Sequence, residues 1–595
     1  MLQVRSSTFS RARTPAYCNV PSLLCRCESV AVASEGDFRH SAPALVKLPL
    51  ILGLHRMQLS LLESLPDEVL RHVLRHCSLS TLLSLSATNR TLHEIISHDY
   101  LATFARTRLN YDPRTLKHIG FHARAPWAQR ALWAERTNRR WNDWDGRGVA
   151  VGGVRREWRR CLPTLKFWEV QDGVEVVIVG RGRDLEVWLT RSDGSLDIVS
   201  VIVRAPVKRS SIRSTCNGKE SPSSHHHGAQ EDVTALASGT RPGEIIVSRV
   251  SGLIQRLCVV EHATGPGHPL VLEETARYSI PDSTANGRRN RSTVQAIHSR
   301  RDVLVSSSTV RKPASVPATE QSMVVDPRGP LVSLARTLKE RSAAQAHSVS
   351  VHSIVAPWQP PVSIPFTTKP WSVHMSPQRS WLAVGHSGTA PLSLFQLDST
   401  GAPSSSTPTR VAHTPKSTSV YGLTTPSEAC SPFSNPEQTL IAAFYDSTTR
   451  VYDLRIPPSP HLASSWDAPS TRERPANEVL RLADPWSDDP SYSVGIGGAH
   501  GAYIAVGTAR NAAVRLFDIR SPARPRGVTA FAPGRDRSPV YSLEVEGSRV
   551  WGCTENRGFL LDFEAFEAPR RHADKVAYVG HQEGEGGVLK WMGAR

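Results

Sequence analysis

The chain has 595 residues and a formal net charge of +17, a length that allows about four average domains or fewer large ones. Apolar residues make up 39% and charged residues 21%, which excludes a wholly disordered chain and a membrane protein built from apolar spans. The charge leaves a nucleic-acid or anionic-surface partner open. Of nine scattered cysteines only Cys25 and Cys27 lie close together, so we expect reduced thiols in a cytoplasmic or nuclear protein.

Residues 1–57 precede the first clear structural signal. Residues 1–27 carry four arginines, no acidic residue and many serines, a composition typical of a mitochondrial transit peptide. We prefer the alternative, a disordered or spurious extension upstream of a start at Met57. The apolar run Ala44–Leu54 has 11 residues and is too short to cross a bilayer, which needs about 20.

Residues 59–105 predict three short amphipathic helices. The first begins at Pro66, whose fixed φ suits a first helical turn, and its apolar residues recur at the spacing of one helix face. Ser78 and Ser80 are expected to cap the second helix, and Thr88 with Asn89 the third. Because such a short unit buries little surface by itself, we expect it to dock on a partner.

The run Leu65-Pro66-Asp67-Glu68-Val69-Leu70, with Leu82-Leu83 and Thr88-Asn89-Arg90 further on, resembles an F-box. Members of that family dock on the Skp adaptor, which joins them to a cullin-RING ubiquitin ligase. This sequence departs from the family at Ser86, Thr88 and Leu101, where Val, Cys and Trp are common. The resemblance implies the following adaptor-binding residues: Leu65, Pro66, Glu68, Val69, Leu70, Leu82, Leu83, Leu92 and Ile95.

A basic connector rich in tryptophan is expected over residues 106–146. Residues 101–166 alone carry a net charge of +10, more than half of the total. A helix opening at Pro126 would align Trp133, Thr137, Trp141 and Trp144 at helical spacing, with arginines around them. Tryptophans that stack on bases and arginines that contact phosphates would suit nucleic acid. We favour a packed connecting helix with buried tryptophans and with arginines that reach water.

The same connector resembles the linker of F-box/WD-repeat proteins. The shared features are Ala125-Pro126-Trp127 before a basic helix and Gly146-Arg147-Gly148 before the first expected strand. The resemblance supports the structural interpretation over nucleic-acid binding.

Residues 147–592 predict an all-β region built from repeats, because short apolar runs alternate with Gly, Ser, Asp and Pro. The expected units are centred on residues 174–189, 233–259, 294–310, 371–395, 419–453, 493–518 and 540–563. Tyr452-Asp453-Leu454-Arg455 and Phe517-Asp518-Ile519-Arg520 resemble the ends of WD repeats, although no unit combines a Gly-His with a Trp-Asp end. We therefore expect a small all-α F-box and helical linker followed by a β-propeller of about seven blades; an array of β-sandwiches is the alternative.

Long polar insertions are expected to leave the repeats as loops. They span residues 205–231, 263–292, 311–370, 398–418 and 456–490. Residues 330–346 predict a short helix inside one of them.

Motifs for catalysis or metal binding are weak. His225-His226-His227 is expected to be a solvated loop, and Gly495–Gly501 a turn between strands rather than a phosphate cradle. Isolated acidic residues in the repeats are interpreted as turn residues. We expect no enzyme, cofactor or metal site.

These features predict the substrate-recognition subunit of a cullin-RING ligase of the Skp–cullin–F-box (SCF) type. By resemblance, the F-box binds the Skp adaptor and the cullin complex, and the propeller binds a protein substrate, phosphorylated or not. One alternative is a receptor of a cullin/DDB-type ligase that uses the D-x-R residues Asp453, Arg455, Asp518 and Arg520, unless these arginines pair with neighbouring carboxylates. A propeller scaffold or RNA-binding protein without a ligase is the other.

Overall fold

The computed structural model describes residues 65–88, 90–108, 126–143, 147–151, 162–169, 175–190, 199–203, 232–241, 243–260, 271–278, 291–311, 345–426, 435–457, 477–484, 487–498, 501–520, 526–532, 537–563 and 578–580. The expected extension over 1–57, the histidine run 225–227 and the helix expected over 330–346, except its last two residues, lie outside these ranges. None of the described helices is long and apolar enough to cross a membrane.

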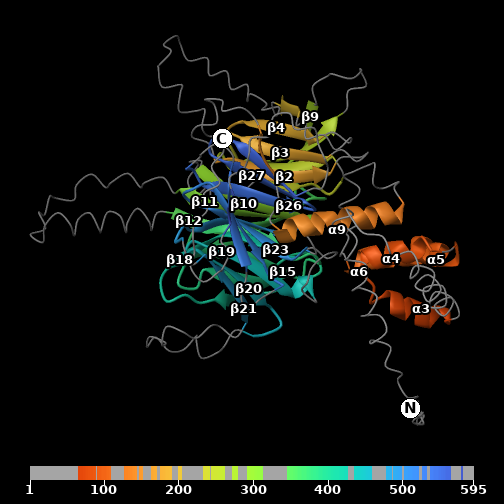
Figure 1. Ribbon diagram of the computed structural model, residues 1–595. Coiled ribbons are helices and arrows are strands. Elements are labelled where there is room, and N and C mark those ends of the chain that lie inside the picture. Colours follow the sequence, from red (N-terminus) through yellow and green to blue (C-terminus); the bar gives the residue numbers. More distant parts are fainter. Residues whose placement is uncertain are drawn as a thin grey trace, which may run out of the picture. The chain divides into compact units, whose positions relative to one another are not determined.

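Short helices form the N-terminal part of the described chain and appear red to orange in Figure 1. They are α3 (Asp67–Leu74), α4 (Leu79–Ser86), α5 (Arg90–Glu94), the π-helix η1 (Ile95–Tyr100) and α6 (Leu101–Arg108). The chain divides into two compact units, Met1–His76 and Cys77–Arg595, so α3 belongs to the first and the other helices to the second. Within the second unit α4, α5, η1 and α6 contact one another in sequence.

The helix starts follow local capping chemistry. The Ser78 hydroxyl accepts a hydrogen bond from the Thr81 amide at 3.2 Å, which confirms the predicted cap of α4. Thr88 differs from its prediction, because its hydroxyl donates to the Leu85 carbonyl at 2.6 Å and so closes α4 instead of opening α5. Asn89 lies outside the described residues. The last predicted helix is longer than expected, since η1 and α6 carry it on to Arg108.

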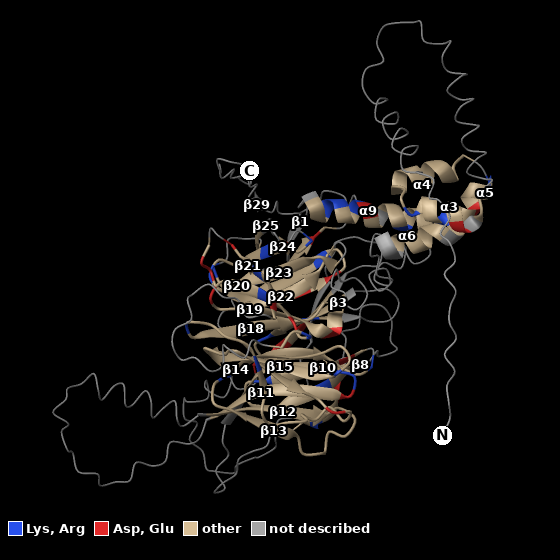
Figure 2. Cartoon of the chain, turned by 90° about the horizontal axis from the view of Figure 1, so that it is seen from below, with Lys and Arg blue, Asp and Glu red and all other residues tan. Residues whose placement is uncertain are grey.

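The connector contains the predicted helix, α9 (Trp127–Asp143). Its buried residues Ala131, Ala134, Thr137 and Trp141 recur at intervals of three and four and form one face. Arg136 and Arg139 are exposed, and the basic positions along the α9 ribbon are blue in Figure 2. α9 contacts α4 and α6.

In the described residues, twenty-eight strands form seven antiparallel blades of four; a short pairing of β15 with β18 joins blades 4 and 5 into one sheet. Blade 1 holds β2 (Thr164–Glu169), β3 (Glu175–Arg181), β4 (Asp184–Thr190) and β5 (Val199–Val203). Blade 2 holds β6 (Val233–Ser238), β7 (Glu244–Arg249), β8 (Ile254–Val260) and β9 (Val271–Tyr278). Blade 3 holds β10 (Arg291–Arg300), β11 (Val303–Arg311), β12 (Gln345–Ser353) and β13 (Val362–Phe366).

The later blades repeat the pattern. Blade 4 holds β14 (Pro370–Met375), β15 (Trp381–Gly388), β16 (Leu392–Gln396) and β17 (Thr409–Ala412). Blade 5 holds β18 (Thr418–Thr424), β19 (Thr439–Phe444), preceded by the 3-10 turn η6 (Pro436–Gln438), β20 (Thr448–Asp453) and β21 (Glu478–Ala483). Blade 6 holds β22 (Ser491–Gly497), β23 (Tyr503–Thr508), β24 (Ala513–Asp518) and β25 (Arg526–Phe531), and β29 (Tyr578–Gly580) pairs with β25. Blade 7 holds β26 (Val540–Glu546), β27 (Arg549–Thr554), β28 (Gly558–Asp562) and β1 (Arg147–Val151).

The blades form a closed ring. The first strand of each blade contacts the first strand of the next, and β2 of blade 1 contacts β26 of blade 7. Blade 7 takes its fourth strand from the start of the region, because β1 pairs with β28 from Arg147↔Asp562 to Val151↔Gly558. A closed ring leaves no open side between its first and last blade. The fold is therefore a seven-bladed β-propeller, as predicted.

The second strand of most blades is buried on both faces. β7, β19, β23 and β27 are buried at every position, which explains their nearly continuous apolar sequences. Gly558 shows how tightly the blades pack, since a Cβ there would lie 1.8 Å from the Trp188 ring of blade 1. The core thus runs around the ring between neighbouring blades.

The predicted insertions were wrong at several places, because they contain strands. β9 lies inside 263–292, β12 and β13 inside 311–370, β17 inside 398–418 and β21 inside 456–490. Four of these five are the outermost strands of their blades. Outer strands have one edge in water and carry polar residues, as in β13, where only the central Ile364 is buried.

Candidate functional site

The nine residues predicted to bind the adaptor differ in exposure. Pro66 and Glu68 are exposed, and Val69 is 45% exposed on α3. Leu65, Leu83 and Ile95 are half-buried. Leu70, Leu82 and Leu92 are buried and stabilise the helices of this chain. A partner could contact the exposed and half-buried residues directly, so the predicted adaptor surface is narrower than the full set.

The first D-x-R motif forms an exposed ion pair after β20. The Arg455 guanidinium donates to both carboxylate oxygens of Asp453, at 2.6 Å from Nη2 to Oδ2 and 2.9 Å from Nε to Oδ1. Hydrogen bonding from Arg455 lowers the pKa of the Asp453 carboxyl. The Arg455 side chain remains 54% exposed beside a hollow lined by Asn435, Gln438 and Val479.

The second D-x-R motif is hydrogen-bonded to the end of the connector helix α9. Arg520 pairs with Asp518 at 2.6 Å and also donates to the Tyr503 hydroxyl at 2.7 Å and to Oδ1 of Asn142 at 2.6 Å. The Tyr503 hydroxyl in turn donates to Asn142 at 2.8 Å. Since Asn142 lies at the end of α9, this arginine is engaged inside the chain.

Trp141 fixes the same end of α9 to the propeller. Its ring stacks on Phe563 with centroids 3.8 Å apart and on Tyr503 at 4.9 Å, and it is fully buried. It also covers Gly498, where φ is +73° and a Cβ would lie 3.0 Å from the indole. The prediction that the connector tryptophans pack as core is confirmed for Trp141. Gly498 follows the last residue of β22, so α9 lies at the end of the ring where the innermost strands finish; we name it the connector face.

The opposite end, which we name the distal face, carries a continuous aromatic cluster. Four of its members lie in the first half of four consecutive innermost strands, β14, β18, β22 and β26. The fifth is the residue that follows β19. Ring centroids lie 4.8 Å apart for Trp371 and Tyr421, 4.6 Å for Tyr421 and Tyr492, 5.4 Å for Tyr421 and Tyr445, and 5.3 Å for Tyr492 and Tyr541. We name Trp371, Tyr421, Tyr445, Tyr492 and Tyr541 the aromatic arc.

A repeated backbone device places these rings. In β14, β18, β22 and β26 the register shifts at the aromatic residue, so each is the extra residue of a β-bulge. Neighbouring innermost strands approach each other around the central channel, so the contacting rings follow the channel mouth. Burial raises the pKa of the Tyr421 hydroxyl and of the Tyr492 hydroxyl. Tyr445 is the most exposed member at 45%.

No role was predicted for the arc, although a signal was present. An aromatic residue stands first or second in each of the runs Trp371-Ser372-Val373, Val420-Tyr421-Gly422, Tyr492-Ser493-Val494 and Val540-Tyr541-Ser542. Alternation alone would assign such residues to a strand face, and the bulge that aims them at the channel is not visible in the sequence.

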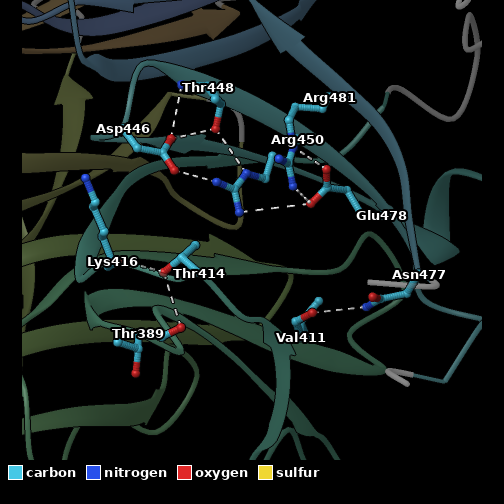
Figure 3. Close-up of polar contacts among 10 residues, drawn as sticks. All are labelled: Thr389, Val411, Thr414, Lys416, Asp446, Thr448, Arg450, Asn477, Glu478 and Arg481. Carbon is cyan, nitrogen blue, oxygen red and sulfur yellow. Dashed lines mark hydrogen bonds and ion pairs between the residues drawn. The ribbon is translucent and has the colours of Figure 1, made fainter. Parts of the chain in front are cut away.

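A polar network runs along blade 5, from Asp446 in the distal turn next to Tyr445 to Glu478 at the start of β21. Arg450 is buried, pairs with Asp446, and lies 4.0 Å from Glu478, which also pairs with Arg481 at 2.6 Å (Figure 3). The prediction that acidic residues in the repeats occupy turns was wrong for Glu478, whose side chain is fully buried on β21. Arg450 and Arg481 compensate the negative charge of Glu478, because an unpaired buried charge is costly.

Comparisons with known proteins match separate parts of the chain. A family model described as F-box-like matches residues 62–104. The curated proteins contain no match. Among solved structures, the β-propeller domain of Cps50 (Swd1) from Myceliophteria thermophila is 10% identical, with a TM-score of 0.38 over 70% of this chain and 98% of that chain. A chain of a mitotic checkpoint complex is 12% identical, with a TM-score of 0.40 over 70% of this chain and 90% of that chain. With an F-box-like domain at 62–104 and a closed ring of seven blades, the chain is an F-box/β-propeller protein.

Proposed function

We propose that this protein is the substrate-recognition subunit of a cullin-RING ubiquitin ligase of the SCF type. Its F-box-like domain would bind the Skp adaptor, and its propeller would hold a protein substrate. The chain would contribute no catalytic group. It would raise the rate of ubiquitin transfer by holding substrate lysines near the ubiquitin-conjugating enzyme.

The observation that carries the proposal is the F-box-like domain, with Pro66, Glu68 and Val69 exposed at its start. An apolar side chain such as Val69, 45% exposed beside an exposed proline, is suited to burial against a partner. The contacts that hold α9 against the connector face support the same function, because they leave the distal face for a substrate.

Adaptor binding by exposed α3 residues is directly testable. We expect Pro66→Ala combined with Val69→Glu to lower recovery of the Skp adaptor in co-precipitation by at least about tenfold, since a charge would be buried without a partner. Leu70 is unsuitable for this test because its burial would confound binding with folding.

Trp358→Ala is the matched control. This side chain is 80% exposed in the loop between β12 and β13, and its removal should leave adaptor recovery unchanged. Equal recovery from the Pro66/Val69 variant and the control would refute the SCF proposal and favour the propeller scaffold.

A receptor of a cullin/DDB-type ligase is the second candidate function, favoured by the exposed Arg455. Arg455→Glu should then reduce recovery of the DDB-type adaptor while the Skp adaptor is absent from the precipitate. Arg520 is a poorer candidate for that contact because Asn142 and Tyr503 already engage it.

A further inference from the structure

The outer edge of blade 6 carries a fifth strand. β29 pairs antiparallel with β25 and places Gly580 opposite Val528 and Tyr578 opposite Ala530. Among the described strands, no other outer strand of the ring pairs with a further strand on its free edge. A segment near the C-terminus of the chain therefore binds this edge through its backbone, in the way that strand addition joins a peptide to a sheet.

The sequence of β25 leaves its edge open to such pairing. Four other outer strands, β9, β13, β17 and β21, carry charged residues or a proline, which are Glu273, Glu274, Arg277, Pro365, Arg410, Glu478 and Arg481. Charged side chains and proline discourage the addition of a strand to an edge. After Arg526, β25 reads Gly-Val-Thr-Ala-Phe and has neither. β1 and β5 share this open composition, but within the described part of the chain only β25 has a strand on its free edge.

β29 covers only the middle of the edge. Three of the six residues of β25 have a partner on β29, namely Val528, Thr529 and Ala530. Three residues form few ladder hydrogen bonds, and each contributes little net stability, so β29 is a weak occupant. A longer strand would also pair with Phe531, whose partner on the inner side is Ala513 of β24. Such a strand can displace β29 because it makes more hydrogen bonds along the same edge.

The exposure of β25 indicates which side chains an added strand should carry. Ala530 is buried, Thr529 is half-buried and Phe531 is 37% exposed. An added strand would therefore continue a surface that is partly buried and has an aromatic residue at its end. β-branched and aromatic residues fit a half-buried sheet surface best and pair well with an aromatic residue across strands. β29 itself offers Tyr578 and Val579 at the paired positions.

We infer that the outer edge of blade 6 is a strand-addition site for an extended segment of a partner protein, and that β29 occupies this site until the partner displaces it. The segment is longer than the three residues of β29, is rich in Val, Ile, Thr, Tyr or Phe, and has no proline where it pairs. The inference goes beyond the proposed ligase function, because the edge would serve a substrate receptor and a propeller scaffold alike.

The same segment of a second copy is the rival occupant. Residues 564–577 are all that separate β29 from the last described residue of blade 7, Phe563. So short a tether gives the chain's own β29 a high effective concentration at the edge, which disfavours exchange between copies. A partner must therefore compete by pairing over a longer stretch.

Displacement is tested on the full chain with a fluorescein-labelled synthetic peptide that copies residues 574–582. In the variant Tyr578→Pro combined with Val579→Pro, the chain loses whichever of the two amides points at β25, so its own strand no longer pairs. The ring closes through β1 and β28, so the propeller keeps its fold. We expect this variant to bind the peptide at least about tenfold more tightly than the unaltered chain, because the site is no longer occupied. Fluorescence polarisation measures both affinities.

Three controls locate the binding. Glu583→Pro combined with Glu585→Pro adds two prolines after β29, and this variant should bind the peptide as the unaltered chain does. A peptide with proline in place of its Tyr and Val should not bind the double-proline variant of β29. Phe531→Lys, added to that variant, should weaken binding about fivefold or more, because lysine protects an edge. Amides of β25 should exchange hydrogen faster in the variant and regain protection when the peptide is added.

Selection from a random phage-displayed peptide library tests the chemistry of the partner. The bait is the full chain with Tyr578→Pro and Val579→Pro. We expect enriched peptides to share a run of about four or more residues drawn mainly from Val, Ile, Thr, Tyr and Phe, without proline. The unaltered chain should bind synthetic copies of them at least about tenfold more weakly, since β29 competes for the edge.

Several outcomes would overturn the inference. They are equal peptide affinities of the unaltered chain and the β29 variant, hydrogen exchange in β25 that neither variant nor peptide changes, and binding of the proline-containing peptide. A selection that enriches no peptide, or peptides without such a run, would also do so. Dimers of the unaltered chain in sedimentation velocity that the β29 variant does not form would assign the edge to a second copy instead. Adaptor recovery enters none of these measurements, so the ligase proposal is tested separately.

Discussion

Trp141 stabilises the joint between connector and propeller. A fully buried indole stacked between Phe563 and Tyr503 contributes both buried area and ring contacts. We expect Trp141→Ala to lower the free energy of unfolding by about 3–5 kcal/mol, as for other buried tryptophans. Urea denaturation followed by circular dichroism measures this, and Trp358→Ala should change it by less than about 0.5 kcal/mol. Equal effects of the two substitutions would contradict the packing described.

Two histidines between blades 3 and 4 should make the propeller sensitive to acid. His298 and His374 have ring centroids 4.4 Å apart. Burial, with the charges of Arg300 and Lys166, lowers the pKa of His374 to about 3, and burial with the charge of His374 lowers that of His298. Unfolding returns both to about 6.5, so the unfolded chain binds more protons between those values.

Stability should therefore be constant above about pH 6.5 with respect to these groups and fall as the pH drops toward 3. For His374 alone the loss is on the order of 2 kcal/mol by pH 5. His374→Gln should reduce the change of the free energy of unfolding with pH below 6.5. The same substitution at His93, an exposed residue on α5, should not. The urea midpoint as a function of pH decides between them, and identical slopes would be inconsistent with a buried neutral His374.

Individual residues also show where sequence reasoning stops. The burial of Trp141 follows from helical periodicity, because its apolar neighbours recur along one face of α9. The burial of Glu478 does not, since Arg450 lies on β20 and approaches Glu478 only when β20 pairs with β21. The role of Arg520 was equally invisible, because Asn142 is hundreds of positions away in sequence.

At the scale of elements, the inner strands could be predicted and the outer strands could not. β19, β23 and β27 are buried at every position, so selection for packing leaves long apolar runs. β13 and β17 border solvent, and their short, partly polar sequences resemble loops. Seven units were therefore predicted correctly, although the fourth strands of four blades, β9, β13, β17 and β21, were assigned to insertions.

The pairing of β1 with β28 gives a prediction at this scale. Successive amides of a strand point in opposite directions, so only one of Gly148 and Val149 donates toward β28. We expect one of Gly148→Pro and Val149→Pro to cost about 3 kcal/mol by removing a ladder hydrogen bond, and the other to cost much less. Each substitution controls for the other in urea denaturation. Two equally mild effects would mean that β1 does not close the ring.

For the whole molecule, the connector helix α9 and the aromatic arc lie on opposite faces of the ring. If the ligase proposal holds, the rigid attachment of α9 sets the direction in which a bound substrate is presented. We expect Asn142→Ala combined with Arg520→Ala to leave adaptor recovery unchanged but to slow ubiquitylation of a bound substrate severalfold, because effective concentration depends on geometry. Single-turnover transfer assays measure this, with Arg455→Ala as the control. An unchanged rate of ubiquitin transfer would show that the hydrogen bond between Asn142 and Arg520 is not needed to orient the substrate.

The pairing of β1 with β28 also has a consequence during protein synthesis. Residues 147–151 leave the ribosome early but find their partner only after residues 558–562 have been made. Contacts between segments so distant in sequence form slowly, and until then β1 and the edge of blade 7 both expose unpaired backbone groups. A chain arrested before blade 7 would therefore already contain the F-box-like domain yet lack a closed ring, and such products should depend on chaperones until translation ends.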